Sequence, residues 1–195
     1  MKKVLFYKCL INERFGLSAD ECILYSYLVY QSISGYEDVW DKESGKFDDY
    51  SIKECNGWVS IPQTLYSHKY GNINCQKIAN FLGISRVSVW RMIKKFVNIG
   101  IIDNIQGNIN TKYIYVNGFF ELQTSTKLKG ELLIFFSWLM DLKGCSPAIY
   151  AKRKKLACMY HSTFSNIRDY MHRLNKLGLV KRDENYSIQT NVHEC

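Results

Sequence analysis

Residues 74–99 read NCQKIANFLGISRVSVWRMIKKFVNI, and this stretch decides the fold. It holds two amphipathic segments. Asn74 is a suitable N-cap for the first segment, whose apolar face is made of Ile78, Ala79 and Leu82. Ser85 is a suitable N-cap for the second, whose apolar residues recur at helical spacing: Val89, Met92, Ile93 and Phe96. Gly83 accepts the positive φ that a sharp corner commonly demands. We therefore predict two short helices joined by a tight turn.

The polar face of the second segment is cationic. Its outward side chains are those of Arg86, Ser88, Trp90, Arg91, Lys94 and Lys95. A helix that buries one stripe and offers cations, a hydroxyl and a planar ring on the other suits the major groove of double-stranded DNA. The alternative is an amphipathic helical hairpin with no nucleic-acid role, because apolar stripes at helical spacing are usually core.

The pattern Ala79-x-x-x-Gly83-x-Ser85, with Ile84 and Val89 beside it, resembles the winged helix-turn-helix family of bacterial DNA-binding proteins. The residues that follow also fit this family, because Gly100 closes the second helix and two β-rich runs, 101–105 and 112–116, flank a polar turn. The resemblance implies that these runs are the strands of a wing. Residues 107–112, which end in Lys112, would then contact the DNA backbone.

A weaker copy of this stretch returns 78 residues later, when Gly178 is aligned with Gly100. Thr163 matches the cap Ser85, and the apolar positions recur as Leu156, Ala157, Ile167, Met171 and Leu174. His161 replaces the corner glycine, and histidine enters the left-handed region more readily than most side chains. Upstream, residues 23–29 match residues 134–140 at an offset of 111. The first copy therefore holds about 33 extra residues, an insertion that a surface connection can absorb.

The repeat divides the 195 residues into two domains, 1–121 and 122–195. We expect a mainly α protein with small β wings, an α+β fold of two tandem winged-helix domains. The formal charge of +8 is made up of +2 in residues 1–121 and +6 in residues 122–195. Basic charge favours a polyanionic partner through counterion release.

The insertion, about residues 34–71, is acidic and aromatic, unlike the basic remainder of the chain. Its residues 34–56 hold seven acids and three bases. Residues 58–62 alternate like a short edge strand, and Pro62 limits their pairing. Four interpretations stay open: a partner-binding arm, an acidic flap over a basic surface, a loop that positions the first domain on DNA, or an ordered loop packed on its own domain.

The second domain has its own cationic run just ahead of Leu156: Lys152, Arg153, Lys154 and Lys155. Placed at the start of a helix, these side chains would hold the phosphate backbone without reading sequence. The alternative is a solvated surface run. Arg168 lies on the outward face of the second copy, but Asp169 beside it would be repelled by phosphate. The second domain is therefore either a second DNA-binding module or a dimerisation or packing module.

Several other classes of protein find no support in the sequence. No nucleotide-binding loop, dinucleotide fingerprint, zinc-protease motif or serine-hydrolase motif is present, so we expect neither an enzyme nor a cofactor. The seven cysteines include no Cys-x-x-Cys pair, and we expect no metal site. The longest apolar run, near residues 132–140, is well under a membrane span, and no signal core is present. We expect a cytoplasmic protein.

Three functions follow, in order of preference. The first is a transcriptional regulator that binds double-stranded DNA and reads the major groove with the helix after Ser85. The second is a replication initiator binding origin repeats, because tandem winged-helix modules in a short basic chain resemble the initiators of bacterial plasmids and phages. The third is a winged-helix scaffold for protein interactions without DNA. A homodimer formed through the second domain or the insertion stays open.

Overall fold

The computed structural model describes residues 4–33, 40–41, 46–47, 57–67, 71–111, 118–146, 148–182 and 187–190 of the chain. These residues form a mixed α+β structure of helices and small antiparallel sheets. The chain divides into two compact units. The N-terminal unit comprises Val4–Leu10 and Arg14–Phe119, and the C-terminal unit includes Ile11–Glu13 and Phe120–Cys195.

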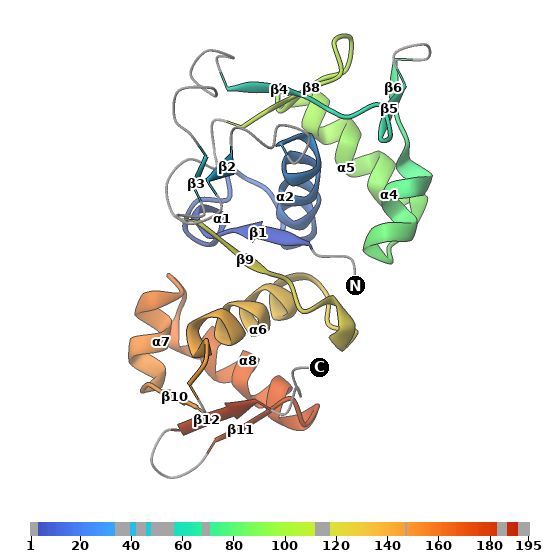
Figure 1. The fold of residues 1–195 in the computed structure, drawn as a ribbon. Coiled ribbons are helices and arrows are strands. Elements are labelled where there is room, and N and C mark those ends of the chain that lie inside the picture. Colours follow the sequence, from blue (N-terminus) through green and yellow to red (C-terminus); the bar gives the residue numbers. More distant parts are fainter. Residues whose placement is uncertain are drawn as a thin grey trace. The chain divides into compact units, whose positions relative to one another are not determined.

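The elements run along the chain as labelled in Figure 1. The α-helices are α1 (Cys9–Asn12), α2 (Ala19–Ile33), α4 (Cys75–Leu82), α5 (Arg86–Asn98), α6 (Gly130–Lys143), α7 (Arg153–Met159) and α8 (Phe164–Lys176), with a 3-10 turn at Thr124–Thr126. The strands are β1 (Leu5–Tyr7), β2 (Trp40–Asp41), β3 (Lys46–Phe47), β4 (Trp58–Ser60), β5 (Tyr66–Ser67), β6 (Asn72–Ile73), β7 (Ile102–Asp103), β8 (Asn108–Asn110), β9 (Phe119–Glu121), β10 (Ile149–Tyr150), β11 (Val180–Arg182) and β12 (Ser187–Thr190).

The core of the N-terminal unit forms around α2, which is buried along most of its length. α5 packs against α2, and the rings of Phe96 and Tyr25 meet edge to face with their centroids 6.3 Å apart. β4, β8 and β7 form an antiparallel sheet in that order, with Val59 opposite Ile109 and Ile109 opposite Ile102. The Tyr25 hydroxyl donates to the Asn110 carbonyl at 2.5 Å and so ties α2 to the sheet.

The hairpin after α5 is tighter than the sequence suggests. The predicted strands were residues 101–105 and 112–116, but β7 pairs with β8 at 108–110, inside the predicted turn. The actual turn is short because the Asp103 carboxylate accepts from the backbone amides of Ile105 and Gln106, at 2.9 and 3.1 Å. Gly107 then takes a φ of 71° and returns the chain to β8. Residues 112–117, including Lys112, lie outside the described residues.

The strand β4 divides the insertion and belongs to the element order that both units share. Trp58–Ser60 forms β4 at the edge of the sheet, so the predicted edge strand is confirmed. One part of the insertion lies before β4 and holds the β2–β3 hairpin. The other part lies after it and holds the β5–β6 hairpin. The predicted insertion over about residues 34–71 therefore contains in its middle a strand that pairs with β8.

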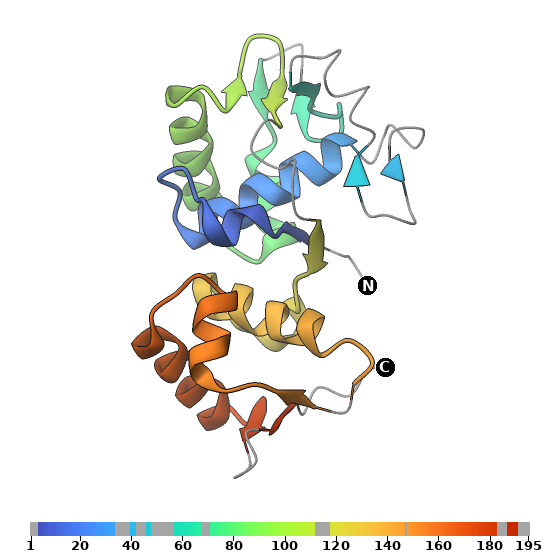
Figure 2. The ribbon, with the colours of Figure 1, turned by 90° about the vertical axis from the view of Figure 1, so that its left-hand side faces the viewer.

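The C-terminal unit is built from α6, α7 and α8 and a second three-stranded antiparallel sheet, ordered β10, β12, β11. Figure 2 shows its helices gathered together, and α8 contacts both α6 and α7. An aromatic cluster fills the space between α6 and the end of α7. The Phe135 and Trp138 rings lie 5.8 Å apart, and each lies 5.0 Å from the ring of Tyr160.

The two units repeat one order of elements: helix, strand, helix, helix and a two-stranded hairpin. In both sheets a strand that precedes the helix pair joins the last strand of the hairpin, giving β4-β8-β7 and β10-β12-β11, although β5 and β6 stand between β4 and α4 in the N-terminal unit. α5 and α8 begin and end 78 residues apart, at Arg86 and Asn98 and at Phe164 and Lys176. The internal repeat predicted from the sequence is therefore present as a repeated topology.

Candidate nucleic-acid interface

Two N-cap side chains and a corner glycine, all predicted from the sequence, define the helix pair α4–α5. The Asn74 side chain accepts from the Lys77 amide at 3.0 Å, and the Ser85 hydroxyl accepts from the Ser88 amide at 3.0 Å. Gly83 turns the corner with a φ of 67°. Four side chains of α5 face the core: Val89, Met92, Ile93 and Phe96. Both N-caps and the corner glycine are thus confirmed, and together they fix which face of α5 points outward.

The outward face of α5 is exposed, cationic and partly apolar. Arg86, Ser88, Arg91 and Lys94 are exposed, and the whole helix holds no acidic residue. The Trp90 side chain is 54% exposed and lies beneath the Lys94 ammonium, whose Nζ is 5.4 Å from the ring centroid. The Ser88 hydroxyl shares a 2.8 Å hydrogen bond with the Ser85 hydroxyl. Five of the six predicted α5 residues therefore share one accessible surface.

Lys95, the sixth, is held by the protein itself. Its ammonium donates to the Glu21 carboxylate at 2.7 Å and to the Gly16 carbonyl at 3.1 Å. Burial raises the pKa of Glu21, but the hydrogen bonds from Lys95 and from the Ser18 amide outweigh it, and the pKa lies below its usual value. Lys95 therefore lies at the edge of the buried stripe, where α5 meets the start of α2, and its ammonium is bound within the N-terminal unit.

A groove of about 820 Å³ runs beside the start of α5. Arg86, Val87 and Trp90 line one side. The other side comes from residues around the β5–β6 hairpin and the start of α4, including Gln63, Thr64, Ser67, Asn72 and Gln76. Cys75 also lines the groove, and burial raises the pKa of its thiol although the Arg86 charge opposes the shift. The thiol is therefore a neutral group in this wall at neutral pH.

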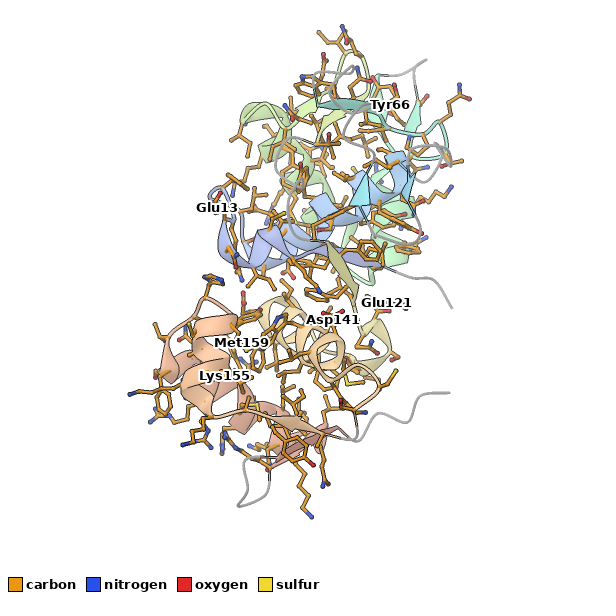
Figure 3. The ribbon with its side chains drawn as sticks, turned by 60° about the vertical axis from the view of Figure 1, so that its left-hand side comes forward. Glu13, Tyr66, Glu121, Asp141, Lys155 and Met159 are labelled. Atoms are coloured by element: carbon orange, nitrogen blue, oxygen red, sulfur yellow. The ribbon has the colours of Figure 1, made fainter. Side chains whose placement is uncertain are left out.

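Tyr66 joins the β5–β6 hairpin to the turn between β7 and β8 (Figure 3). Its buried ring lies against Gly107, where an added Cβ would come within 2.5 Å of the ring. Its hydroxyl donates to the Asn104 carbonyl at 2.5 Å. Any side chain at position 107 would displace this ring. Tyr66 therefore ties β5 to this turn, and residues of β5 and β6 contribute to the wall of the groove.

The cationic run of the C-terminal unit lies at the start of α7, as predicted. Lys152 is the N-cap residue, and Lys152, Lys154 and Lys155 are exposed. Figure 3 labels Lys155 at the surface of α7. Arg153 is half-buried and, together with Arg168, lines a pocket of about 470 Å³. Arg182 and His172 lie in the same pocket, but so does Asp169, whose carboxylate is 3.6 Å from Arg168 Nε.

Sequence reasoning missed the polar residues of the β5–β6 hairpin and the apolar Val87, which is 56% exposed on α5. A helical projection could have placed Val87 beside Trp90, because three residues bring a helix back to the same face. No local pattern could have placed Gln63 and Asn72 beside α5.

Comparisons with protein-family models, with curated proteins and with solved structures gave no significant match. No relative therefore assigns a role to a side chain of either unit. Among the described residues, no helix is both long and apolar enough to cross a membrane. In the same residues, no group of three or more metal-ligating side chains gathers at one place.

Proposed function

We propose that this protein is a sequence-specific double-stranded DNA-binding protein, a transcriptional regulator built from two winged-helix modules. In this proposal α4 and α5 are the helix-turn-helix of the first module, and the β7–β8 hairpin is its wing. α7, α8 and the β11–β12 hairpin are the corresponding parts of the second module. The repeated element order and the matching strand order of the two sheets support this interpretation.

The observation that carries the proposal is the division of α5 into two faces. One face is buried, and the other exposes Arg86, Ser88, Trp90, Arg91 and Lys94 without a single acid in the helix. A helix fits the major groove of B-DNA, and arginine is the side chain best suited to paired hydrogen bonds with guanine. Arg86 and Arg91 are therefore the residues we assign to base reading, and Lys94 to positioning.

The second module supports binding mainly through charge. Lys152, Lys154 and Lys155 extend from the start of α7, where they would contact phosphates and set the register without reading bases. α8 is less suited to reading DNA, because Asp169 is exposed beside Arg168 on its outward face. We assign direct reading to the first module and backbone contacts to the second.

The test is a double substitution in α5, Arg86→Ala with Arg91→Ala, measured on the duplex that the unmodified protein selects from a random library. Because a good bidentate contact contributes about 1–3 kcal/mol of discrimination, affinity for that duplex should fall roughly 30-fold or more. The control removes the same charge from α8, Arg168→Ala with Arg173→Ala, and should retain the preference for that duplex. Normal binding by the α5 variant would show that this helix does not read DNA.

The arrangement of the selected sites separates the regulator from the alternative role in replication. A two-fold symmetric site would mirror a protein dimer and fits a regulator, whereas evenly repeated sites fit an initiator. A protein that retains no duplex even at low salt would instead be an interaction scaffold.

A further inference from the structure

We propose that the groove between α5 and the β5–β6 hairpin holds an unpaired nucleotide, with its base stacked on Trp90. The inference rests on the proposed function, because the ligand is again a nucleic acid, but the nucleotide bound here is unpaired. The major-groove contact requires paired bases, and this groove would take a base that has left the helix.

The groove has an exposed indole in its wall. Trp90 is 54% exposed although it lies in the middle of α5, and its position lines the groove. A buried tryptophan would pack in the core, but here Val89, Met92 and Ile93 pack in the core from the opposite face of α5. Stacking on an aromatic side chain is the main apolar interaction open to an unpaired base, and every base has a face for it.

The opposite wall of the groove carries polar side chains. Gln63 and Asn72 are exposed carboxamides that line the groove, each with donor and acceptor groups suited to a base edge. Arg86 also lines the groove and supplies positive charge for the adjoining phosphate, while Lys94 lies over the indole. An aromatic platform with cations along a groove is the combination that proteins use for single strands.

Hydrogen bonds within the N-terminal unit hold the wall opposite Trp90 in place. The Asn74 amide donates to the Leu65 carbonyl at 2.7 Å, and Lys77 Nζ donates to the Thr64 carbonyl at 3.2 Å. The first bond extends the pairing of β5 with β6, the second ties α4 to the residues just before β5, and Tyr66 ties β5 to the turn after β7. The C-terminal unit has no such hairpin, because Ala151 and Lys152 alone separate β10 from α7. The wall is thus specific to the first module.

The experiment compares three labelled probes on the full chain: a fully paired duplex, the same duplex with one extra unpaired thymidine, and single-stranded oligothymidylate. The unmodified protein should bind the bulged duplex roughly tenfold more tightly than the paired one, the size expected of one stacked base. Trp90→Ala should remove this preference, and Trp90→Phe should retain most of it. Arg168→Ala, at the matching position of α8, should leave the preference unchanged.

Tryptophan fluorescence gives a second readout on the same probes. The bulged duplex should quench emission in the unmodified protein more than in Trp90→Phe, because stacking quenches the indole that the variant lacks. Equal binding of paired and bulged duplexes, or a preference that persists in Trp90→Ala, would overturn the inference and leave duplex binding standing.

The single-stranded probe separates this inference from the proposed function. Trp90-dependent binding of oligothymidylate by a protein that retains neither duplex would support the groove and overturn a double-stranded target. Failure to bind any of the three probes at low salt would overturn both proposals.

Discussion

The helix pair α4–α5 and the helix pair α7–α8 have the same interior and different surfaces. Val89 and Phe96 of α5 correspond to Ile167 and Leu174 of α8, and all four are fully buried. The N-caps also correspond, because Ser85 accepts from the amide three residues on and Thr163 does the same. The shared features therefore specify the fold, and any difference in function has to come from the exposed residues.

The surfaces diverge at matching positions. Arg86 and Arg91 of α5 correspond to Phe164 and Asp169 of α8. Trp90 corresponds to Arg168, whose neighbour is that acid. The first module thus offers a continuous cationic and aromatic face, and the second offers its cations mainly at the start of α7. Four sets of substitutions test how far the two helix pairs differ.

The largest effect is expected from the lysines of the second module. Replacing Lys152, Lys154 and Lys155 by alanine should weaken binding to every duplex. The slope of log affinity against log salt concentration should become less negative by about one for each phosphate that is no longer neutralised. Affinity measurements over a salt series check this, with a mixed-sequence duplex as a second probe. An unchanged salt slope would exclude α7 from the DNA interface, and weaker binding to one sequence alone would mean that these lysines read bases.

Because the two helix pairs share the same buried positions, truncating a corresponding side chain in either pair should reduce the free energy of unfolding by a similar amount. Phe96→Ala should reduce the free energy of unfolding by about 3–5 kcal/mol, and Leu174→Ala by about 2–5 kcal/mol, because each side chain is fully buried. Chemical denaturation followed by circular dichroism measures both. Substitution of the exposed Leu177 by alanine is the control and should have little effect. A cost below about 1 kcal/mol at either buried position would contradict a common core.

Substitutions at the corner between the two helices should have unequal effects on the stability of the two pairs. Gly83→Ala should cost about 1–2 kcal/mol, because no atom would contact the new Cβ and only the positive φ opposes it. His161 already accepts a φ of 48° in the second corner. His161→Gly should therefore change stability by less than about 0.5 kcal/mol, since relief of strain is offset by the entropy of the unfolded glycine. Thermal unfolding of the two variants measures both effects, and an equal cost at the two corners would contradict this interpretation.

The smallest effect should come from the ion pair of Lys95 with Glu21, which the second module does not repeat at the matching residue, Arg173. The pKa of Glu21 is lowered on folding, so the pair stabilises the protein above the pKa of the unfolded carboxyl and loses this effect as pH falls through the folded pKa. Glu21→Gln should cost about 0.5–1 kcal/mol at neutral pH, because the Lys95 side chain is 40% exposed.

Denaturation of the Glu21→Gln variant and the unmodified protein at neutral pH and at about pH 3 checks the sign. The difference should shrink in acid. A difference that persists there would mean that the charge of Glu21 is not its cause. Arg173→Met, at the position of α8 that matches Lys95, is the control and should show no such dependence on pH.

Local signals in the sequence predicted most of the helix pairs. Asn74, Ser85 and Thr163 are caps whose hydrogen bonds reach only three residues along the chain, and the buried stripes follow from helical spacing. The strands were harder to place, because their pairing depends on residues far apart. The Asp103 carboxylate closes the turn early, and this moved β8 into the predicted loop.

Tertiary contacts account for what the sequence did not reveal about the surface. Lys95 has the spacing of an outward residue, yet Glu21 lies 74 positions earlier and meets it only in the folded unit. The groove beside Trp90 has the same origin, since its wall depends on Tyr66 reaching Asn104 and Gly107. Surface chemistry of this kind is set by the fold and leaves no periodic pattern.

Selection from a random duplex library at several salt concentrations tests whether α5 reads a DNA sequence. We predict one enriched motif, an affinity for it that falls steeply with salt, and loss of that enrichment in the Arg86→Ala, Arg91→Ala variant. Retention of no duplex even at low salt, or an enriched motif that the α5 variant selects equally well, would contradict DNA reading by the first module.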